Sequence, residues 1–176
     1  MGVVVAAGAV VAIVLLRSGP GGPAHILTTP ARLGAYVRQS QLARQMDVAQ
    51  LEKNIIANSS GQASRVVSAV YEKGSTMPGG PAPQVILFIG GKLTGAPATA
   101  SIKSFDQHFR DAKATSPGRL GGRAACVPTQ PGSNHATVCA WFDHDTFGEL
   151  VSTSMTASAL ADELRAIRPS IERISK

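Results

Sequence analysis

Apolar and polar residues alternate most clearly between residues 123 and 152, the segment that contains both cysteines and the only tryptophan of the chain. Within residues 136–142, every second residue is Ala, Val or Phe, and these alternate with Thr137, Cys139 and Trp141. This period of two is typical of a half-buried strand. Shorter apolar runs on either side, separated from it by turn residues, predict two further strands.

Three segments carry apolar stripes with the spacing of an amphipathic helix. The first two cover residues 41–58 and 101–113, and the third begins at a capping Ser154 or Thr156 and ends at Pro169. The stripe of the third helix consists of Ala157, Leu160, Ala161, Leu164 and Ile167.

Other apolar runs predict strands at residues 26–30, 63–71 and 84–89. The last is continuously apolar, which is typical of a central strand covered on both faces, and we expect Gly90 and Gly91 to end it. In the predicted order of elements, consecutive strands that can form hairpins predominate, and strands and helices do not alternate strictly. We therefore expect an α+β fold, with a mostly antiparallel sheet and helices packed mainly on one face.

Residues 3–16 contain no polar side chain, and Arg17 and a Gly/Pro-rich linker follow them. This apolar stretch is only slightly shorter than a membrane-spanning helix, which needs about 17–25 residues. We expect residues 1–17 to form a transmembrane or signal-anchor helix and residues 18–25 to form a linker. Residues 26–176 should then form one extracytoplasmic α+β domain.

The orientation of this membrane segment has alternatives. Because Arg17 follows the apolar stretch, the positive-inside rule favours a cytoplasmic body, whereas the cysteine pair favours an extracytoplasmic one. A start site upstream of Met1 that adds basic residues would remove the conflict. A cleavable signal peptide ending at residues 22–24 is a further alternative, although Pro23 makes a poor cleavage site.

Composition and charge limit the partners. Hydrophobic residues make up 44% of the chain, which is enough for a core, and the net charge of +6 comes from basic residues spread along the sequence. No Lys/Arg run of the nucleic-acid-binding type is present. We expect contact with the membrane through residues 3–16 and with an envelope protein or an anionic polymer, and no nucleic acid.

Cys126 and Cys139 lie on predicted neighbouring strands with turn residues between them, so they are expected to form a cross-strand disulfide. Two free core cysteines are one alternative. A zinc site that adds His135 and His144 is another, but the spacing that lets one turn supply two ligands is missing.

Residues 143–146, Asp-His-Asp-Thr, place a histidine between two carboxylates. A calcium loop would need ligands where Phe147 and Ser154 stand. An acid–base pair would need a carboxylate that faces the imidazole, and immediate chain neighbours diverge on a strand or turn. We therefore predict a polar surface hairpin turn without catalysis.

Residues 90–93, Gly-Gly-Lys-Leu, follow an apolar strand as a phosphate-binding loop would, but Ile86 occupies the position of the first glycine in that motif. No serine lies in a nucleophile elbow. We assign no catalytic, cofactor-binding or metal-binding residue and expect no cofactor. Only Cys126 and Cys139 are assigned a role, as the disulfide.

The run from Cys139 to Gly148, with residues 121–126 before it and residues 164–169 after it, resembles a group of uncharacterised actinobacterial membrane proteins. These have one N-terminal membrane segment and an extracytoplasmic domain of this size, and the similarity covers residues 28–172. The resemblance implies location and a disulfide-bonded strand pair, but no reaction or site. Many members have a basic cytoplasmic N-terminus, which this chain lacks.

These observations favour a membrane-anchored, non-enzymatic binding or scaffolding module at the cell envelope. The alternative is a secreted or anchored envelope hydrolase. A hydrolase would bring convergent polar side chains with shifted pKa values into one pocket, and His108, Asp143, His144 and Asp145 are the candidates.

Overall fold

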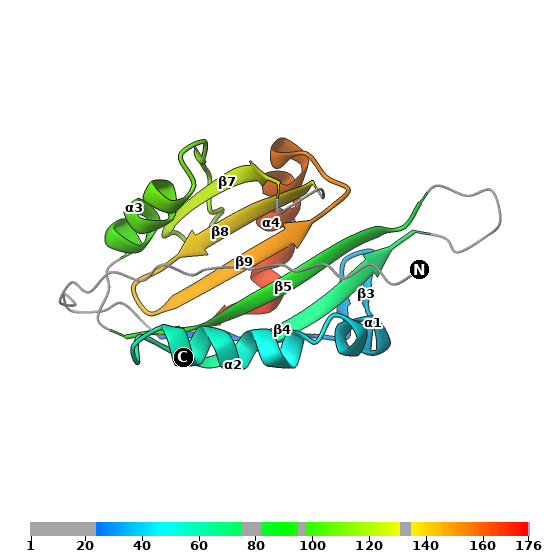
Figure 1. The fold of residues 1–176 in the computed structure, drawn as a ribbon, viewed down its shortest axis with the longest axis horizontal. Coiled ribbons are helices and arrows are strands. Elements are labelled where there is room, and N and C mark those ends of the chain that lie inside the picture. Colours follow the sequence, from blue (N-terminus) through cyan, green and yellow to red (C-terminus); the bar gives the residue numbers. More distant parts are fainter. Residues whose placement is uncertain (1–23, 75–81, 95–97, 131–134, 176) are drawn as a thin grey trace.

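The computed structural model describes residues 24–74, 82–94, 98–130 and 135–175, which form an α+β domain around a large antiparallel sheet (Figure 1). The strands of this sheet are β2 (Arg32–Leu33), β3 (Tyr36–Arg38), β4 (Ala63–Lys73), β5 (Gln84–Leu93), β6 (Lys113–Thr115), β7 (Arg123–Thr129), β8 (Ala136–Phe142) and β9 (Thr146–Ser152). Their order across the sheet is β2-β3-β4-β5-β9-β8-β7-β6. The α+β class and the antiparallel sheet agree with the sequence prediction.

A separate two-stranded sheet joins the ends of the domain. Strand β1 (His25–Leu27) pairs antiparallel with β10 (Glu172–Ile174), so that His25 lies opposite Ile174. The expected membrane segment, residues 3–16, lies outside the described residues. None of the helices in the described ranges is both long and apolar enough to cross a membrane.

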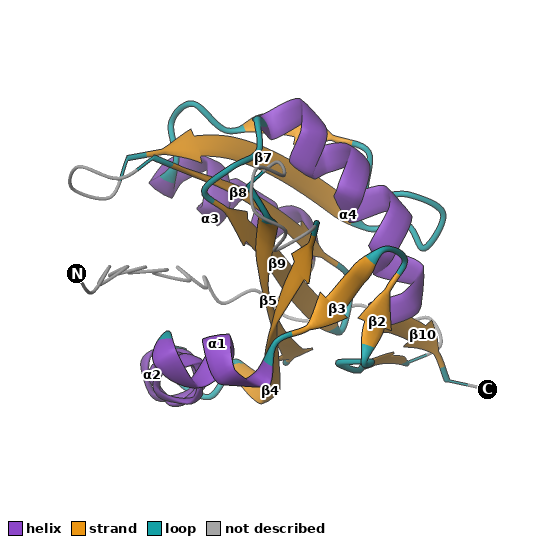
Figure 2. Ribbon diagram, turned by 90° about the vertical axis from the view of Figure 1, so that its right-hand side faces the viewer, coloured by secondary structure: helices purple, strands orange, loops and turns teal. Residues whose placement is uncertain are grey.

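Helices cover both faces of the large sheet (Figure 2). The four helices are α1 (Ser40–Gln45), α2 (Val48–Asn58), α3 (Ala98–His108) and α4 (Ala157–Ile171). Ile55 of α2 and Phe105 of α3 belong to one buried cluster, while Leu164 of α4 belongs to another on the opposite face. Helices α1–α3 lie on one face, in agreement with the prediction that helices pack mainly on one face, and, among the described helices, α4 alone covers the other.

Helix boundaries differ from the sequence prediction at three places. Asp47, with φ 49°, divides the predicted helix 41–58 into α1 and α2. Helix α3 begins and ends earlier than expected, and residues 113–115 form an edge strand instead. Pro169 does not end α4, because buried Ile171 and a hydrogen bond from the Glu172 amide to the Arg168 carbonyl extend the helix beyond it.

Strand β5 also continues where the sequence predicts its end. Gly90 pairs with Gly148 of β9, and the chain stays extended to Leu93. A Cβ atom at Gly90 would lie 2.7 Å from the carbonyl oxygen of Phe147, and one at Gly91 would lie 2.9 Å from that of Ser64. The two glycines thus permit close approach of the neighbouring strands.

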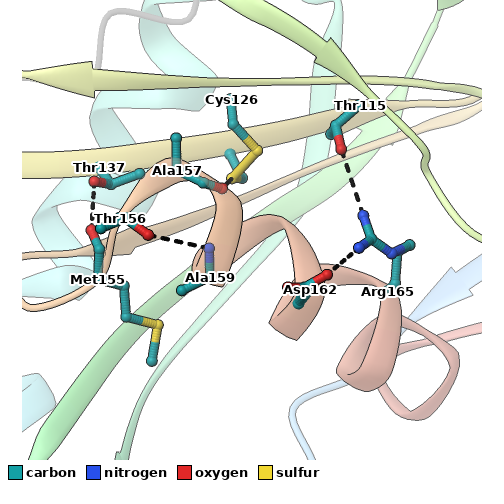
Figure 3. The surroundings of a disulfide bond; sticks show 10 residues. Thr115, Cys126, Thr137, Met155, Thr156, Ala157, Ala159, Asp162 and Arg165 are labelled. Carbon is teal, nitrogen blue, oxygen red and sulfur yellow. Dashed lines mark hydrogen bonds and ion pairs between the residues drawn. A yellow bond between two sulfur atoms is a disulfide. The ribbon is translucent and has the colours of Figure 1, made fainter.

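The predicted disulfide is present between paired strands. Cys126 of β7 lies opposite Cys139 of β8, and the bond packs against the start of α4, where the Cys139 sulfur is 4.0 Å from the Ala157 carbonyl oxygen (Figure 3). Thr156, one of the two predicted caps, accepts a hydrogen bond from the Ala159 amide. A disulfide of this kind indicates an oxidising, extracytoplasmic location.

Replacing both Cys126 and Cys139 by alanine should lower the free energy of unfolding by about 3 kcal/mol, because the open chain regains loop entropy in the unfolded state. Urea unfolding of the oxidised chain and the variant measures the difference. Reduced wild-type protein should unfold at the same midpoint as the variant. If the variant and the reduced wild-type protein both unfold at the midpoint of the oxidised wild type, the bond adds no stability.

Candidate functional site

Charged side chains gather where the β8–β9 turn meets the terminal strands β1 and β10. We call this group the corner cluster. It consists of His25, Lys92, Asp143, His144, Asp145, Arg168 and Glu172. The cluster has an inner half, centred on Arg168, and an outer half, centred on Asp145.

In the inner half, the guanidinium group of Arg168 is surrounded by acceptors. The side chain is 1% exposed, and its Nε donates to Glu172 Oε2 at 2.6 Å. One terminal nitrogen is ion-paired with Asp143, and the other donates to the carbonyl oxygens of Pro117 and Gly121, each at 2.8 Å. A buried cation with this many partners is a structural anchor.

Glu172 has both carboxylate oxygens occupied as well. Its Oε2 accepts from Trp141 Nε1 at 3.0 Å in addition to Arg168, and its Oε1 accepts from Thr146 Oγ1 at 2.6 Å. All these groups are buried. The inner half therefore ties the C-terminal end of α4 to strands β8 and β9.

In the outer half, Asp145 directs its two oxygens to different neighbours. Its Oδ2 accepts from Lys92 Nζ at 2.6 Å and from the backbone amide of His25 at 2.9 Å. Its Oδ1 lies 2.8 Å from His25 Nδ1 and 3.6 Å from His144 Nε2. The two imidazole rings lie side by side, with centroids 5.1 Å apart.

Two carboxylates of the cluster have pKa values shifted in opposite directions. Burial raises the pKa of Asp143 to about 7, with Arg168 and His25 opposing the shift and Glu172 adding to it. For Asp145, burial acts in the same upward direction, but hydrogen bonds from Lys92 and His25 outweigh it and lower the pKa. Asp145 is therefore ionised at neutral pH.

The structure confirms the hairpin at residues 143–146, with Phe142 paired to Phe147, but corrects its predicted exposure. Asp143 is 4% exposed and Thr146 is fully buried, because the terminal strands cover the turn. Only the side chain of His144 remains about one-third accessible, at 34%. A hairpin turn can thus be local in sequence and still be enclosed by distant segments.

Three of the four residues proposed for a hydrolase pocket, Asp143, His144 and Asp145, do come together. His108 does not join them: it lies on α3, on the opposite face of the sheet, with its ring against Phe109. The bonded Cys126 and Cys139 have no thiolate to offer, so the zinc site that used them is excluded in this oxidised form.

Four cluster residues escaped the sequence analysis: His25, Lys92, Arg168 and Glu172. His25 was assigned to the linker and Lys92 to a strand-ending turn, so the sequence pattern around these two residues did not indicate a site. Arg168 and Glu172 stand four residues apart, which is the spacing of an ion pair on a helix. That spacing was the one available signal.

Two groups in the cluster have the residue types of a metal site. They are His25 with His144 and Asp145, and His25 with Asp143 and Glu172, and in each group the ligand atoms all lie within 4.8 Å of one another. In the second group both carboxylates are already bonded to Arg168. The first group keeps Asp145 Oδ1 directed at two imidazole nitrogens.

A further buried acid lies apart from the cluster. Glu149 of β9 is 7% exposed and is flanked by Ile89 of β5 and Ala140 of β8, on the face that carries α1–α3. Burial raises the pKa of this carboxyl group to about 7. Its charged form is therefore disfavoured in the folded protein.

Replacing Glu149 by glutamine should stabilise the protein at pH 8 and leave it unchanged at pH 4. The folded-state pKa of Glu149 is raised above its ordinary value of 4.5, so the contribution of this group to stability is full below pH 4.5 and is lost as the pH rises through about 7. The difference at pH 8 should reach about 3 kcal/mol. Unfolding midpoints across this pH range measure it.

Asp111→Asn, at an exposed position, serves as the matched control and should not change the shape of the stability–pH curve. A Glu149→Gln effect of equal size at pH 4 and pH 8 would contradict the assignment, because ionisation would then not be its cause.

Comparisons with protein-family models, curated proteins and solved structures found no match to this chain.

Proposed function

We propose that this protein is a membrane-anchored, extracytoplasmic module that binds or scaffolds another component of the cell envelope without catalysing a reaction. The Cys126–Cys139 disulfide carries the location, because such bonds persist in oxidising compartments. The apolar residues 3–16 supply the proposed anchor. The resemblance to extracytoplasmic actinobacterial proteins supports the same arrangement.

The contacts within the corner cluster leave its carboxylates little freedom to act in catalysis. A general base needs a free carboxylate or imidazole that faces a substrate. In the cluster, Glu172 is bonded to Trp141, Thr146 and Arg168, and Asp145 is bonded to Lys92 and His25. These contacts hold the terminal strands to the sheet, which is a structural role.

The basic surface indicates the class of partner. The net charge of +6 attracts anionic lipids and anionic cell-wall polymers at low ionic strength. An envelope protein with an acidic surface would satisfy the same condition. The partner should therefore be released from the full-length protein by salt if charge dominates the contact.

Location is tested with the full chain in intact cells or spheroplasts. Added protease should digest the domain, and free-thiol titration of protein purified without reductant should find no free thiol on Cys126 or Cys139 after unfolding, which is needed because both residues are buried. The protein should stay in the membrane fraction after high-salt and carbonate washes. A domain that remains intact until lysis and carries two free thiols would overturn the proposed topology.

Binding is tested by purifying the full chain from envelope extracts under oxidising conditions. A specific partner should be recovered in fixed proportion and should be lost with the Cys126→Ala/Cys139→Ala variant if it recognises the disulfide-bonded sheet. Equal recovery from a mock purification would contradict binding.

An envelope hydrolase is the second candidate, and the His25–Asp145 contact is the observation that favours it. An imidazole oriented by a carboxylate is a common general base. Purified full-length protein should then release soluble fragments from isolated cell walls, and His25→Gln should abolish the release. No release by the wild-type protein would leave the binding module as the supported function.

A further inference from the structure

We propose that His25, His144 and Asp145 form a binding site for a divalent transition-metal ion of the Zn²⁺ class. Two imidazole nitrogens and one carboxylate oxygen converge there from β1 and from the β8–β9 turn. This inference does not depend on the envelope location or on the presence of a binding partner.

The distances suit such an ion. Zn²⁺ bonds nitrogen and oxygen at about 2.0–2.2 Å in a tetrahedral arrangement, which places ligand atoms about 3.3 Å from one another. Asp145 Oδ1 lies 2.8 Å from His25 Nδ1 and 3.6 Å from His144 Nε2. These two separations bracket the required value, and all three ligand atoms lie within 4.8 Å of one another.

The carboxylate ligand is already oriented by its neighbours. Lys92 and the backbone amide of His25 both bond Asp145 Oδ2, which leaves Oδ1 for the ion. Such outer contacts fix the direction of a ligand and strengthen metal binding. For His25 Nδ1 to bind, the ring proton must reside on Nε2, as in one of the two neutral tautomers.

The site opens on one side. The side chain of His25 is 6% exposed and that of Asp145 is 20% exposed, whereas that of His144 is 34% exposed. Three protein ligands leave a fourth coordination position for water or for a group from outside, as in open zinc sites. An ion can therefore enter from the side of His144.

The ligand types select the metal. Imidazole nitrogen suits Zn²⁺, Co²⁺, Ni²⁺ and Cu²⁺, whereas Ca²⁺ and Mg²⁺ require oxygen ligands in larger number. The neighbouring group of His25, Asp143 and Glu172 is the weaker candidate. The guanidinium group of Arg168 already bonds both of its carboxylates, and the second oxygen of Glu172 accepts from Thr146.

The test titrates the full-length, tag-free protein with Zn²⁺ in a calorimeter and with Co²⁺ in a spectrophotometer. Wild-type protein should bind one ion per chain, with cobalt absorption bands of a nitrogen- and oxygen-ligated site. His144→Ala should weaken Zn²⁺ binding at least tenfold. His108→Ala, which removes an exposed histidine outside the site, should change it less than twofold.

Both variants should unfold at close to the wild-type midpoint without metal, because His108 and His144 are both exposed residues. Added Zn²⁺ should raise the midpoint of wild-type protein and of His108→Ala but not that of His144→Ala. The proposal is overturned if wild-type protein binds no Zn²⁺, if His144→Ala binds it equally well, or if Ca²⁺ binds as tightly as Zn²⁺.

Discussion

Replacing Arg168 by methionine should lower the free energy of unfolding by about 3–5 kcal/mol, because the variant leaves buried carboxylates without their cation. The side chain is 1% exposed and is ion-paired with both Asp143 and Glu172. Methionine keeps much of the apolar volume, so the measured loss reports mainly on charge. Chemical denaturation followed by circular dichroism at pH 8 measures it.

Arg165→Met provides a matched control on the same helix. Arg165 pairs with the exposed Asp162, and an exposed pair of this kind contributes at most about 1 kcal/mol. A triple variant that adds Asp143→Asn and Glu172→Gln to Arg168→Met should recover part of the loss, because no unpaired charge remains. Equal stability of Arg168→Met and the wild type would refute the anchoring role.

Replacing Trp141 by alanine should destabilise the protein by about 3–5 kcal/mol, since a large buried side chain is lost and a cavity remains. The indole is fully buried, stacks on Phe88 with centroids 5.9 Å apart, and donates to Glu172. The Arg168 guanidinium carbon lies 5.5 Å from its ring centroid. Circular dichroism must follow unfolding, because this is the only tryptophan.

Trp141→Phe separates the two contributions of the indole. Phenylalanine fills most of the space but has no donor for Glu172, so the loss should be about 1–3 kcal/mol, the cost of an unsatisfied buried acceptor. A Trp141→Phe loss as large as that of Trp141→Ala would show that the hydrogen bond dominates. A negligible loss in both variants would contradict the buried environment of the ring.

Much of the sheet could be predicted because its signals are local. Residues 136–142 alternate with a period of two, and the strand, its turn and the disulfide partner Cys139 follow from that pattern. The predicted half-burial is wrong, because residues 137–142 are all buried between helices on both faces of the sheet. The apolar stripe of α4 was equally clear, and Thr156, which caps this helix, was one of the two expected caps. In these segments, sequence neighbours determine which side chains share a face.

The corner cluster and the close packing between strands could not be predicted, because they depend on contacts between distant parts of the chain. His25 meets Asp145 from 120 positions away, and no periodicity links the two residues. The sequence predicted a turn at Gly90 and Gly91, although both lie within β5. Gly148 on the neighbouring strand makes room for the Trp141 ring, because a Cβ atom at this position would lie 2.1 Å from that ring. Such close packing is visible only when both strands are in place.

The two outermost strands of the large sheet are short. Strand β2 has 2 residues and β6 has 3, and they begin with the basic residues Arg32 and Lys113. A long, unprotected edge strand is a template on which a second chain can add and start a fibril. At these two strands, copies of this domain crowded together on one surface would find few backbone groups on which to add a further strand.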